Sequence, residues 1–344
     1  MSLDYDTLTF IWFVLLGVLL CGYAILDGFD LGVGMLHPFL ARNDTERRLV
    51  MNSIGPLWDG NEVWLVTFGG ALFAAFPVAY ATVFSSFYTA FFLLLTCLIG
   101  RAVSLEFRSK VHSARWRSVW DVGFFLSSTT AALLLGVAAG NILQGMELGP
   151  KYRYFGSLSS QLGWFPLLVG LLTVSLFAMH GAIYLYLKTD GTLQQRVRRA
   201  FVPLFLTFAS LYLIVSVATW IRAPHSLDNL VRHPWLWIVP ILNLLAVLNV
   251  PRAMHLGRPG YAFFSSSMVI LALGSLFSTA MFPYLMRSTF DSAYGITLQN
   301  ARSSEGTLGT MLIIAAIGFP CVLSYTIAIY WVFRGKVKLD SSSY

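Results

Sequence analysis

The chain has 344 residues, of which 57% are hydrophobic and only 11% are charged, with a mean hydropathy of +0.70. Soluble domains carry about 25% charged residues, so this composition excludes a soluble protein and indicates an integral membrane protein. The formal net charge of +7 does not require nucleic acid as a partner, because Lys and Arg of membrane proteins gather in cytoplasmic loops. Three cysteines, Cys21, Cys97 and Cys321, lie in apolar runs without metal-ligand spacing, and we interpret them as packing residues.

Apolar windows of about 20 residues predict an all-α polytopic fold with nine membrane spans. In chain order these are 8–36, 53–75, 78–100, 121–143, 163–187, 200–222, 235–251, 261–285 and 308–333. The seventh is short and contains Pro240, so its limits are the hardest to place from the sequence. The first follows Asp4 and Asp6 rather than basic residues, and it is too long for a signal-peptide core. We therefore expect residues 1–344 to form a single transmembrane domain.

The basic residues predict how the chain is oriented in the membrane. The loops after the first, third, fifth and seventh spans, together with the C-terminal tail, hold 17 of the 23 Lys and Arg residues. Because basic residues favour the cytoplasmic side, we expect the N-terminus outside and the C-terminus in the cytoplasm. Asp27, Asp59 and Glu62 then fall in the cytoplasmic half of the bilayer.

Two carboxylates stand inside the first span, in the stretch Asp27-Gly-Phe-Asp30. A charge at mid-bilayer costs roughly 2.5–3.5 kcal/mol on insertion scales, so such residues face a bundle interior or a wet cavity. Gly28 and Gly32 form a GxxxG step that lets another helix approach closely. Either the acids only hydrogen-bond to a neighbouring helix, or a desolvated carboxylate holds and passes a proton. Asp27 is the deeper candidate for proton transfer, and Asp30 is expected to brace a helix.

A second acidic group opens the second span, where Asp59 and Glu62 are three residues apart and are expected to share one helix face. Asn61 adds hydrogen-bonding groups, and Trp58 and Trp64 flank the acids. The tryptophans can be interfacial belt residues, which suits Trp58 better than Trp64. Acids with a polar neighbour and aromatic walls favour instead the mouth of a proton-conducting path.

Two further side chains are candidate site residues. Arg101 ends the third span, and its long side chain can reach back to pair with Asp59 or Glu62. Most of the basic run that follows, 106–117, is expected to be a solvated cytoplasmic surface. His180 is the one histidine near the middle of a span. Because a haem held by two histidines needs a second buried one, we expect His180 to be structural and the chain to bind no haem.

Several motifs closely resemble the second subunit of cytochrome bd-type quinol oxidases, a family that includes the cyanide-insensitive oxidases. They are Leu26-Asp-Gly-Phe-Asp-Leu-Gly-Val-Gly34, Arg42-Asn-Asp-Thr-Glu-Arg-Arg48, Pro56-Leu-Trp-Asp-Gly-Asn-Glu-Val-Trp-Leu65 and Gly69-Gly-Ala-Leu-Phe-Ala-Ala-Phe-Pro77. The likeness is nearly continuous over the first 145 residues and looser, but collinear, beyond them.

The resemblance implies a fold and an assembly. It implies nine transmembrane helices in two four-helix bundles plus a peripheral helix. It also implies a larger partner subunit that carries three haems, two of b type and one of d or b type, and the quinol site. A small single-helix accessory subunit and a structural quinone occur in some members. The complex, in the bacterial inner membrane, oxidises quinol and reduces dioxygen to water with protons from the cytoplasm, and does not pump.

The resemblance also implies roles for particular residues. Asp27 and Asp59 match positions that line a proton route, and Trp64 and Arg101 match positions near an oxygen route or the partner. Glu62 departs from relatives that have glutamine there, so the resemblance assigns it no firm role. Two other functions remain open: a proton-coupled secondary transporter, and a scaffold that only stabilises the haem subunit.

Overall fold

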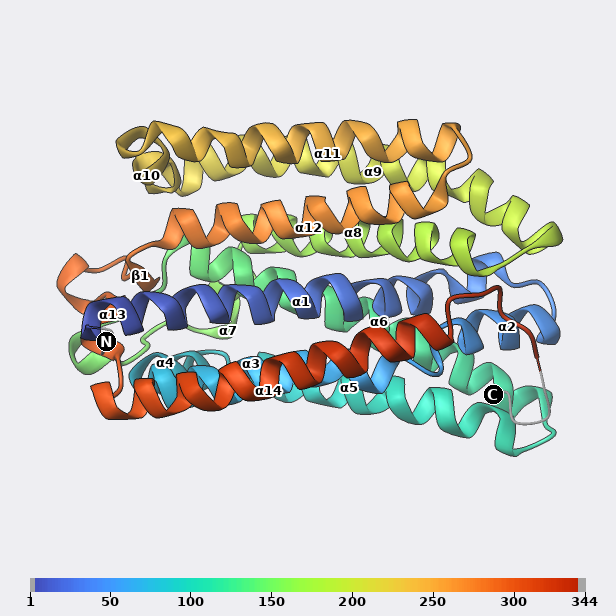
Figure 1. Ribbon diagram of the computed structural model, residues 1–344, viewed down its shortest axis with the longest axis horizontal. Helices are drawn as coiled ribbons and strands as arrows, with labels where there is room; N and C mark the ends of the chain where they lie inside the picture. Colours follow the sequence, from blue (N-terminus) through green and yellow to red (C-terminus); the bar gives the residue numbers. More distant parts are fainter. Residues whose placement is uncertain (1–3, 340–344) are drawn as a thin grey trace.

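The computed structural model describes residues 4–339, most of which lie in helices that run along the long axis of the molecule (Figure 1). Among these residues, eight helices are long and apolar enough to cross a membrane. They are α1 (Tyr5–Leu40), α5 (Tyr88–Phe107), α6 (Ala114–Gln144), α8 (Trp164–Lys188), α9 (Gly191–Arg222), α11 (Ile238–His255), α12 (Pro259–Met281) and α14 (Glu305–Val332). They correspond to eight of the nine predicted spans.

The remaining predicted span, 53–75, is occupied by α3 (Trp58–Ala75). This helix has only 18 residues, and polar residues in its first two turns lower its hydropathy. Residues 53 and 54 belong to the preceding α2 (Asp44–Ile54), an amphipathic helix capped by Asn43, whose side chain accepts a hydrogen bond from the Glu46 backbone N–H. The third predicted span is also divided, because α4 (Pro77–Ser86) ends before Phe87 and α5 begins after it.

Several helices extend past the apolar windows that predicted them. For example, α9 begins at Gly191 although its apolar window begins near residue 200, because the intervening polar residues also favour helix. Pro240 does not interrupt the seventh span. It lies in the first turn of α11, where a backbone N–H has no partner within the helix.

The long helices form two four-helix groups, as expected. In the first group, α1 packs against α3 and α6, and α5 packs against α6. In the second, α8 packs against α9 and α12, and α11 packs against α12. The two groups meet where α1 and α6 pack against α8. Figure 1 shows α14 lying across the first group, and none of its most apolar window is buried, so it is the peripheral helix.

The glycines of α1 explain why the two groups approach closely. A Cβ atom on Gly32 would lie 2.0 Å from the backbone oxygen of Phe177 in α8, and one on Gly181 would lie 2.5 Å from the Gly32 carbonyl carbon. Only glycine allows such a backbone approach. The predicted GxxxG contact is therefore present, and it fixes the segment of α1 that carries Asp27 and Asp30 at the centre of the molecule.

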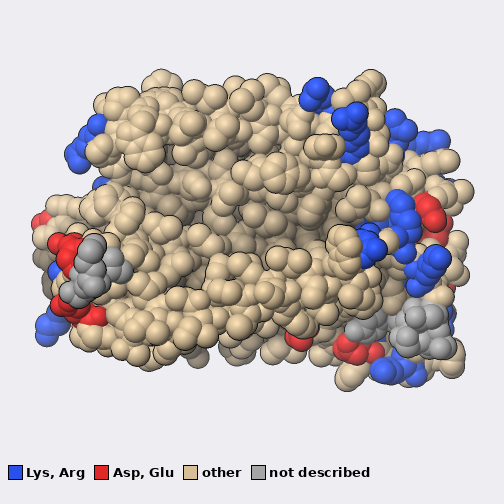
Figure 2. All heavy atoms as spheres, viewed as in Figure 1, with Lys and Arg blue, Asp and Glu red and all other residues tan. Residues whose placement is uncertain are grey.

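The two ends of the molecule differ in structure and in charge. One end, the N-terminal end, holds the start of α1 and the short elements α7 (Leu158–Gln161), α10 (Asp228–Arg232), β1 (Tyr284–Met286), β2 (Ile296–Thr297) and α13 (Leu298–Ala301). The opposite, C-terminal end holds α2 and the tail. Most Lys and Arg residues gather at the C-terminal end, and the face between the ends is almost free of charge (Figure 2).

Candidate functional site

A buried ion pair joins α1 to α5. The Arg101 Nη1 atom lies 2.6 Å from the Asp27 Oδ1 atom, and both side chains are fully buried. The same guanidinium donates from Nη2 to Glu62 Oε2 at 3.1 Å, so Arg101 bridges α1 and α3. Glu62 is the more accessible acid, since its side chain keeps 21% of its exposure. The predicted pairing of Arg101 with Glu62 is present, and Asp27 is its second partner.

Asp30 belongs to a hydrogen-bonded chain that starts on the peripheral helix. The Tyr330 hydroxyl of α14 donates to Asn61 Oδ1 at 3.0 Å. Asn61 in turn donates from Nδ2 to Asp30 Oδ2 at 2.7 Å and to the Leu26 carbonyl at 3.3 Å. Asp30 thus ties α1 to α3, the bracing expected of it. Its link to Tyr330 was not foreseen, because nothing in the sequence places span nine beside span two.

The cluster formed by Asp27, Asp30, Glu62, Arg101 and Asn61, called the carboxylate cluster below, is incompletely satisfied. The Asp27 Oδ2 and Asp30 Oδ1 atoms are buried and have no hydrogen-bond partner among residues 4–339. Buried polar atoms are normally paired, and an exception marks a place for water or an exchangeable proton. Asp27 and Glu62 share one guanidinium, and Asp30 has no cation of its own, so full ionisation would leave uncompensated negative charge in an apolar interior.

Asp59 lies apart from the carboxylate cluster. Its side chain is exposed in the first turn of α3, and Arg101 does not pair with it. Helix geometry explains this, because at about 100° per residue Asp59 and Glu62 are close in angle but the buried face of α3 is centred on Asn61 and Trp64. Glu62 lies at the margin of that face, and Asp59 lies beyond it.

Trp64 and Arg101 are both interior to this chain. Trp64 is 8% exposed, lies edge-on to Phe319 of α14 at 5.9 Å, and occupies the space that a side chain at Gly22 would need. Arg101 is fully buried. Helices of this chain enclose both side chains, so their expected place near an oxygen route or the partner stays a prediction.

His180 is held by its own chain. One ring nitrogen, Nδ1, lies 2.7 Å from Ser266 Oγ, and the other, Nε2, lies 3.1 Å from the Ile25 carbonyl. The ring is also stacked on Phe263. With both nitrogens engaged, His180 does not fit the role of a haem ligand, and its contacts are those of a structural residue that joins α8, α12 and α1.

Most of the run 106–117 is exposed or half-buried, as expected, but Arg108 is an exception. Arg108 is 1% exposed and donates from Nε to Asp121 Oδ1 at 2.6 Å, and from Nη2 to Asp44 Oδ1 at 2.9 Å. Asp121 also pairs with Arg47 at 2.6 Å. This network ties α2, α5 and α6 together near the C-terminal end. It was missed because Asp121 stands at the edge of an apolar window and gave no sign of a partner.

Comparisons with known proteins agree with this architecture. Residues 8–333 match the family model described as cytochrome bd terminal oxidase subunit II. The chain belongs to this family. It is 38% identical to the Escherichia coli K12 protein named cytochrome bd-I ubiquinol oxidase subunit 2, over 98% of this chain and 97% of that one. It is 34% identical to cytochrome bd ubiquinol oxidase subunit 2 of Bacillus subtilis, over 95% of this chain and 96% of that one.

A solved structure shows the same fold. The chain aligns with a chain of the bd oxidase from Geobacillus thermodenitrificans with a TM-score of 0.79 and 16% identity, covering 95% of this chain and 98% of that one. As a subunit II of the bd oxidase family, the chain is a multi-pass helical protein of the bacterial inner membrane and part of an oxidoreductase complex. Membership of this family leaves no support for the secondary-transporter alternative.

Proposed function

We propose that this chain is the haem-free subunit of a bd-type quinol oxidase and that it carries protons from the cytoplasm toward a larger, haem-bearing subunit. The observation that carries the proposal is the carboxylate cluster inside apolar helices, in which Asp27 and Glu62 pair with one guanidinium and Asp30 is bound to the neighbouring Asn61. The partner oxidises quinol and reduces dioxygen to water, a reaction that consumes four protons for each dioxygen.

The charge distribution supports a cytoplasmic origin for those protons. The carboxylate cluster lies on the half of α1 and α3 nearer the C-terminal end, where most Lys and Arg residues gather. By the positive-inside rule this end is cytoplasmic and the N-terminus is outside. Protons taken up there and used to form water contribute to the proton-motive force without being pumped.

The route that we assign begins at Asp59 and continues through Glu62 to Asp27. Asp59 is exposed in the first turn of α3, where it can take up a proton. Glu62 is one turn deeper, partly exposed, and in contact with Arg101. The positive charge of Arg101 offsets part of the negative charge of the inner acids. Because the cluster has more carboxyl groups than cations, it can hold exchangeable protons.

The partner surface that we assign is the exposed face of α3. That face carries Asp59 together with Val63 and Val66, which are 48% and 70% exposed. Glu62, partly exposed at the margin of this face, is the acid through which a proton held by the carboxylate cluster can pass to the partner. The apolar neighbours suit a contact between subunits in the membrane. The family resemblance assigns the haems, of b type and of d or b type, to that partner, and both ring nitrogens of His180 are engaged within this chain.

Trp64 is assigned to a different task. Its neighbours, Leu19, Tyr23 and Phe319, form a mainly apolar contact between α1, α3 and α14. Such a contact suits dioxygen, which is apolar, better than protons.

The test replaces Asp59 by Asn in the complete oxidase, with Asp190→Asn as the control. Asp190 is also exposed at the C-terminal end but lies outside the route. We expect Asp59→Asn to slow quinol oxidation about tenfold or more, as loss of a proton-transfer group does, with an unchanged haem spectrum. Asp190→Asn should leave the rate unchanged.

The same experiment separates a proton route from a scaffold. If this chain only stabilises its partner, Asp59→Asn lowers the yield of haem-loaded complex but not the turnover per haem. Full turnover with an unaltered pH profile would remove Asp59 from the mechanism.

A further inference from the structure

A polar pocket lies at the N-terminal end, at the opposite end of the helices from the carboxylate cluster. It has a volume of about 290 Å³. Its walls come from the end of α6, the loop after α9 and the loop after β1, and they include Gln144, His225, Tyr284, Arg287, Thr289 and Ser292. These three segments are far apart in sequence, so the pocket exists only in the folded chain.

The pocket carries a positive charge without a matching acid. The Arg287 guanidinium lies over the Tyr284 ring, 4.4 Å from its centroid, which holds the side chain in place. Within the part of the chain that the structure describes, Arg287 forms no ion pair, and its Nε atom has no hydrogen-bond partner. Arg287 interacts electrostatically with Asp228 and Arg232 of α10, whose charges are of opposite sign.

His225 provides a second nitrogen in the same wall, which becomes a donor when the ring is protonated. Its Nε2 atom has no hydrogen-bond partner among the described residues. Burial and then the nearby Arg287 lower the pKa of His225, while the Leu143 carbonyl and Asp228 oppose this shift. The imidazole is therefore mostly neutral at pH 7, and an anion placed between the two side chains would be favoured by Arg287 and would favour protonation of His225.

The pocket is placed at the level of lipid headgroups. Gln144 is the last residue of α6, His225 follows the end of α9, and Arg287 follows the end of α12. Exposed tryptophans mark the same level, since Trp164 begins α8 and Trp220 lies in the last turn of α9. Tryptophans prefer the boundary between lipid and water.

We propose that this pocket binds a phosphate group, with the Arg287 guanidinium as its principal donor and His225 as a second. The planar fork of arginine matches two phosphate oxygens, and hydroxyl and amide groups such as those of Ser292 and Gln144 complete a polar wall. The phosphate belongs either to a phospholipid of the outer leaflet or to a free phosphate ion. Basic pockets between transmembrane helices bind lipid headgroups on the cytoplasmic side of membranes, and the same contact between guanidinium and phosphate is available at this end.

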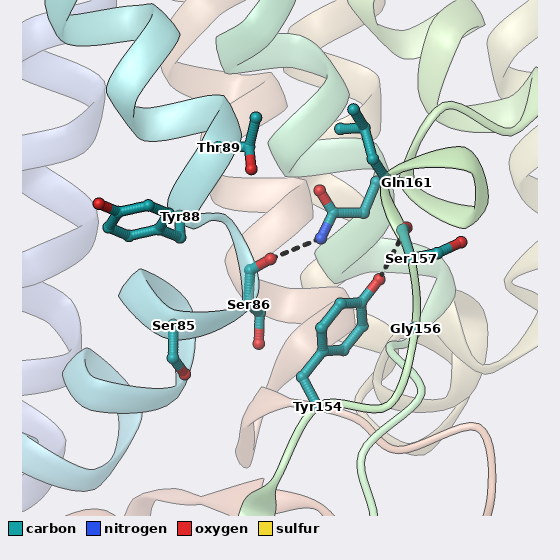
Figure 3. Close-up of a pocket in the computed structure, with 9 residues that line it drawn as sticks. Ser85, Ser86, Tyr88, Thr89, Tyr154, Gly156, Ser157 and Gln161 are labelled. Carbon is teal, nitrogen blue, oxygen red and sulfur yellow. Dashed lines mark hydrogen bonds between the residues drawn. The ribbon is translucent and has the colours of Figure 1, made fainter.

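A neighbouring pocket at the same end provides a contrast. Figure 3 shows this pocket, of about 210 Å³, between the α4–α5 junction and the segment that leads into α7. Its lining is rich in hydroxyl groups, the Gln161 side chain donates to the Ser86 carbonyl at 2.6 Å, and no Lys, Arg or His lines it. Without a positive charge it should not bind phosphate, so Thr89→Val in this pocket is a control.

The experiment measures phosphate binding by the purified, complete oxidase complex. Thermal unfolding is followed while inorganic phosphate, phosphatidylglycerol or a phosphate-free galactolipid is added in mixed micelles, and native mass spectrometry records retained phospholipid. We expect Arg287→Gln to weaken phosphate-dependent stabilisation about ten- to a hundredfold, as loss of a charge-assisted hydrogen bond does. His225→Gln should weaken it less. Thr89→Val should not weaken it, and neither should Arg153→Gln, which removes an exposed arginine outside both pockets.

The probes separate the two sources of the phosphate. Stabilisation by phosphatidylglycerol alone assigns the pocket to a lipid, and stabilisation by inorganic phosphate assigns it to a free ion. The proposal is overturned if neither probe stabilises the unsubstituted complex, or if Arg287→Gln responds as Arg153→Gln does. Should Arg287→Gln fail to assemble, an unchanged response of His225→Gln and Arg287→Lys would overturn it equally.

Discussion

The ion pair between Asp27 and Arg101 offers the sharpest test of the carboxylate cluster. At the observed 2.6 Å separation, the Coulomb attraction is about 6 kcal/mol for an effective dielectric constant near 20, and desolvation offsets much of it. Arg101→Gln leaves three carboxyl groups without a cation and should cost about 3–5 kcal/mol of stability. Asp27→Asn still leaves Arg101 paired with Glu62, so we expect a smaller cost of about 1–3 kcal/mol.

A double-mutant cycle measures this difference. The two single variants and the double variant are compared by reversible unfolding of the purified complex in mixed micelles containing sodium dodecyl sulfate. We expect the double variant to lose less than the sum of the single losses, by about 0.5–3 kcal/mol. Additive losses, or a greater cost for Asp27→Asn than for Arg101→Gln, would refute the account of one cation shared among several acids.

Three further predictions concern other parts of the molecule. Tyr330→Phe removes the donor to Asn61 and should lower stability by about 0.5–1.5 kcal/mol and slow turnover. Tyr325 is exposed on the same helix, so Tyr325→Phe should do neither. Equal unfolding curves for the two variants would contradict the Asn61 contact. Gly32→Ala should impair assembly because its Cβ would meet the Phe177 carbonyl, while Gly260→Ala, with open space around it, should assemble normally as judged by the yield of haem-loaded complex. Burial acts to raise the pKa of Glu46, but hydrogen bonds from Arg196 and the Arg42 backbone N–H outweigh it and lower the pKa. The contribution of Glu46 to the free energy of unfolding should therefore be complete above the unfolded pKa of about 4.3 and disappear as pH falls through the lower folded pKa. Glu46→Gln should remove that acid-dependent loss of stability.

Much of the architecture could be predicted from the sequence because apolar length alone locates membrane helices. Eight windows identified helices that the structure contains, and the GxxxG step at Gly28 and Gly32 correctly indicated a close helix contact. The ends of helices were less predictable, since residues outside the bilayer continue a helix without being apolar. For this reason α9 begins well before its window. The break between α4 and α5 is a different case, because it lies inside one predicted apolar span.

The carboxylate cluster was predicted in part. The acids and Arg101 stood out because charge is rare in apolar spans, but spacing alone could not tell which face of α3 is buried. That face depends on the contacts of Asn61 and Trp64 with other helices, and it excludes Asp59. Contacts between distant segments, such as Tyr330 with Asn61 and Arg108 with Asp121, leave no periodic signal in the sequence.

The position of α14 has a consequence for biogenesis. This last helix has few buried residues, yet Tyr330 near its end supplies a hydrogen bond to Asn61 at the heart of the first group. During synthesis α1, α3 and α5 enter the membrane long before Tyr330 is translated. Asn61 therefore lacks its hydrogen bond from Tyr330 until the final helix docks. A chain truncated before that helix would therefore insert its acids and yet leave them open to the lipid side.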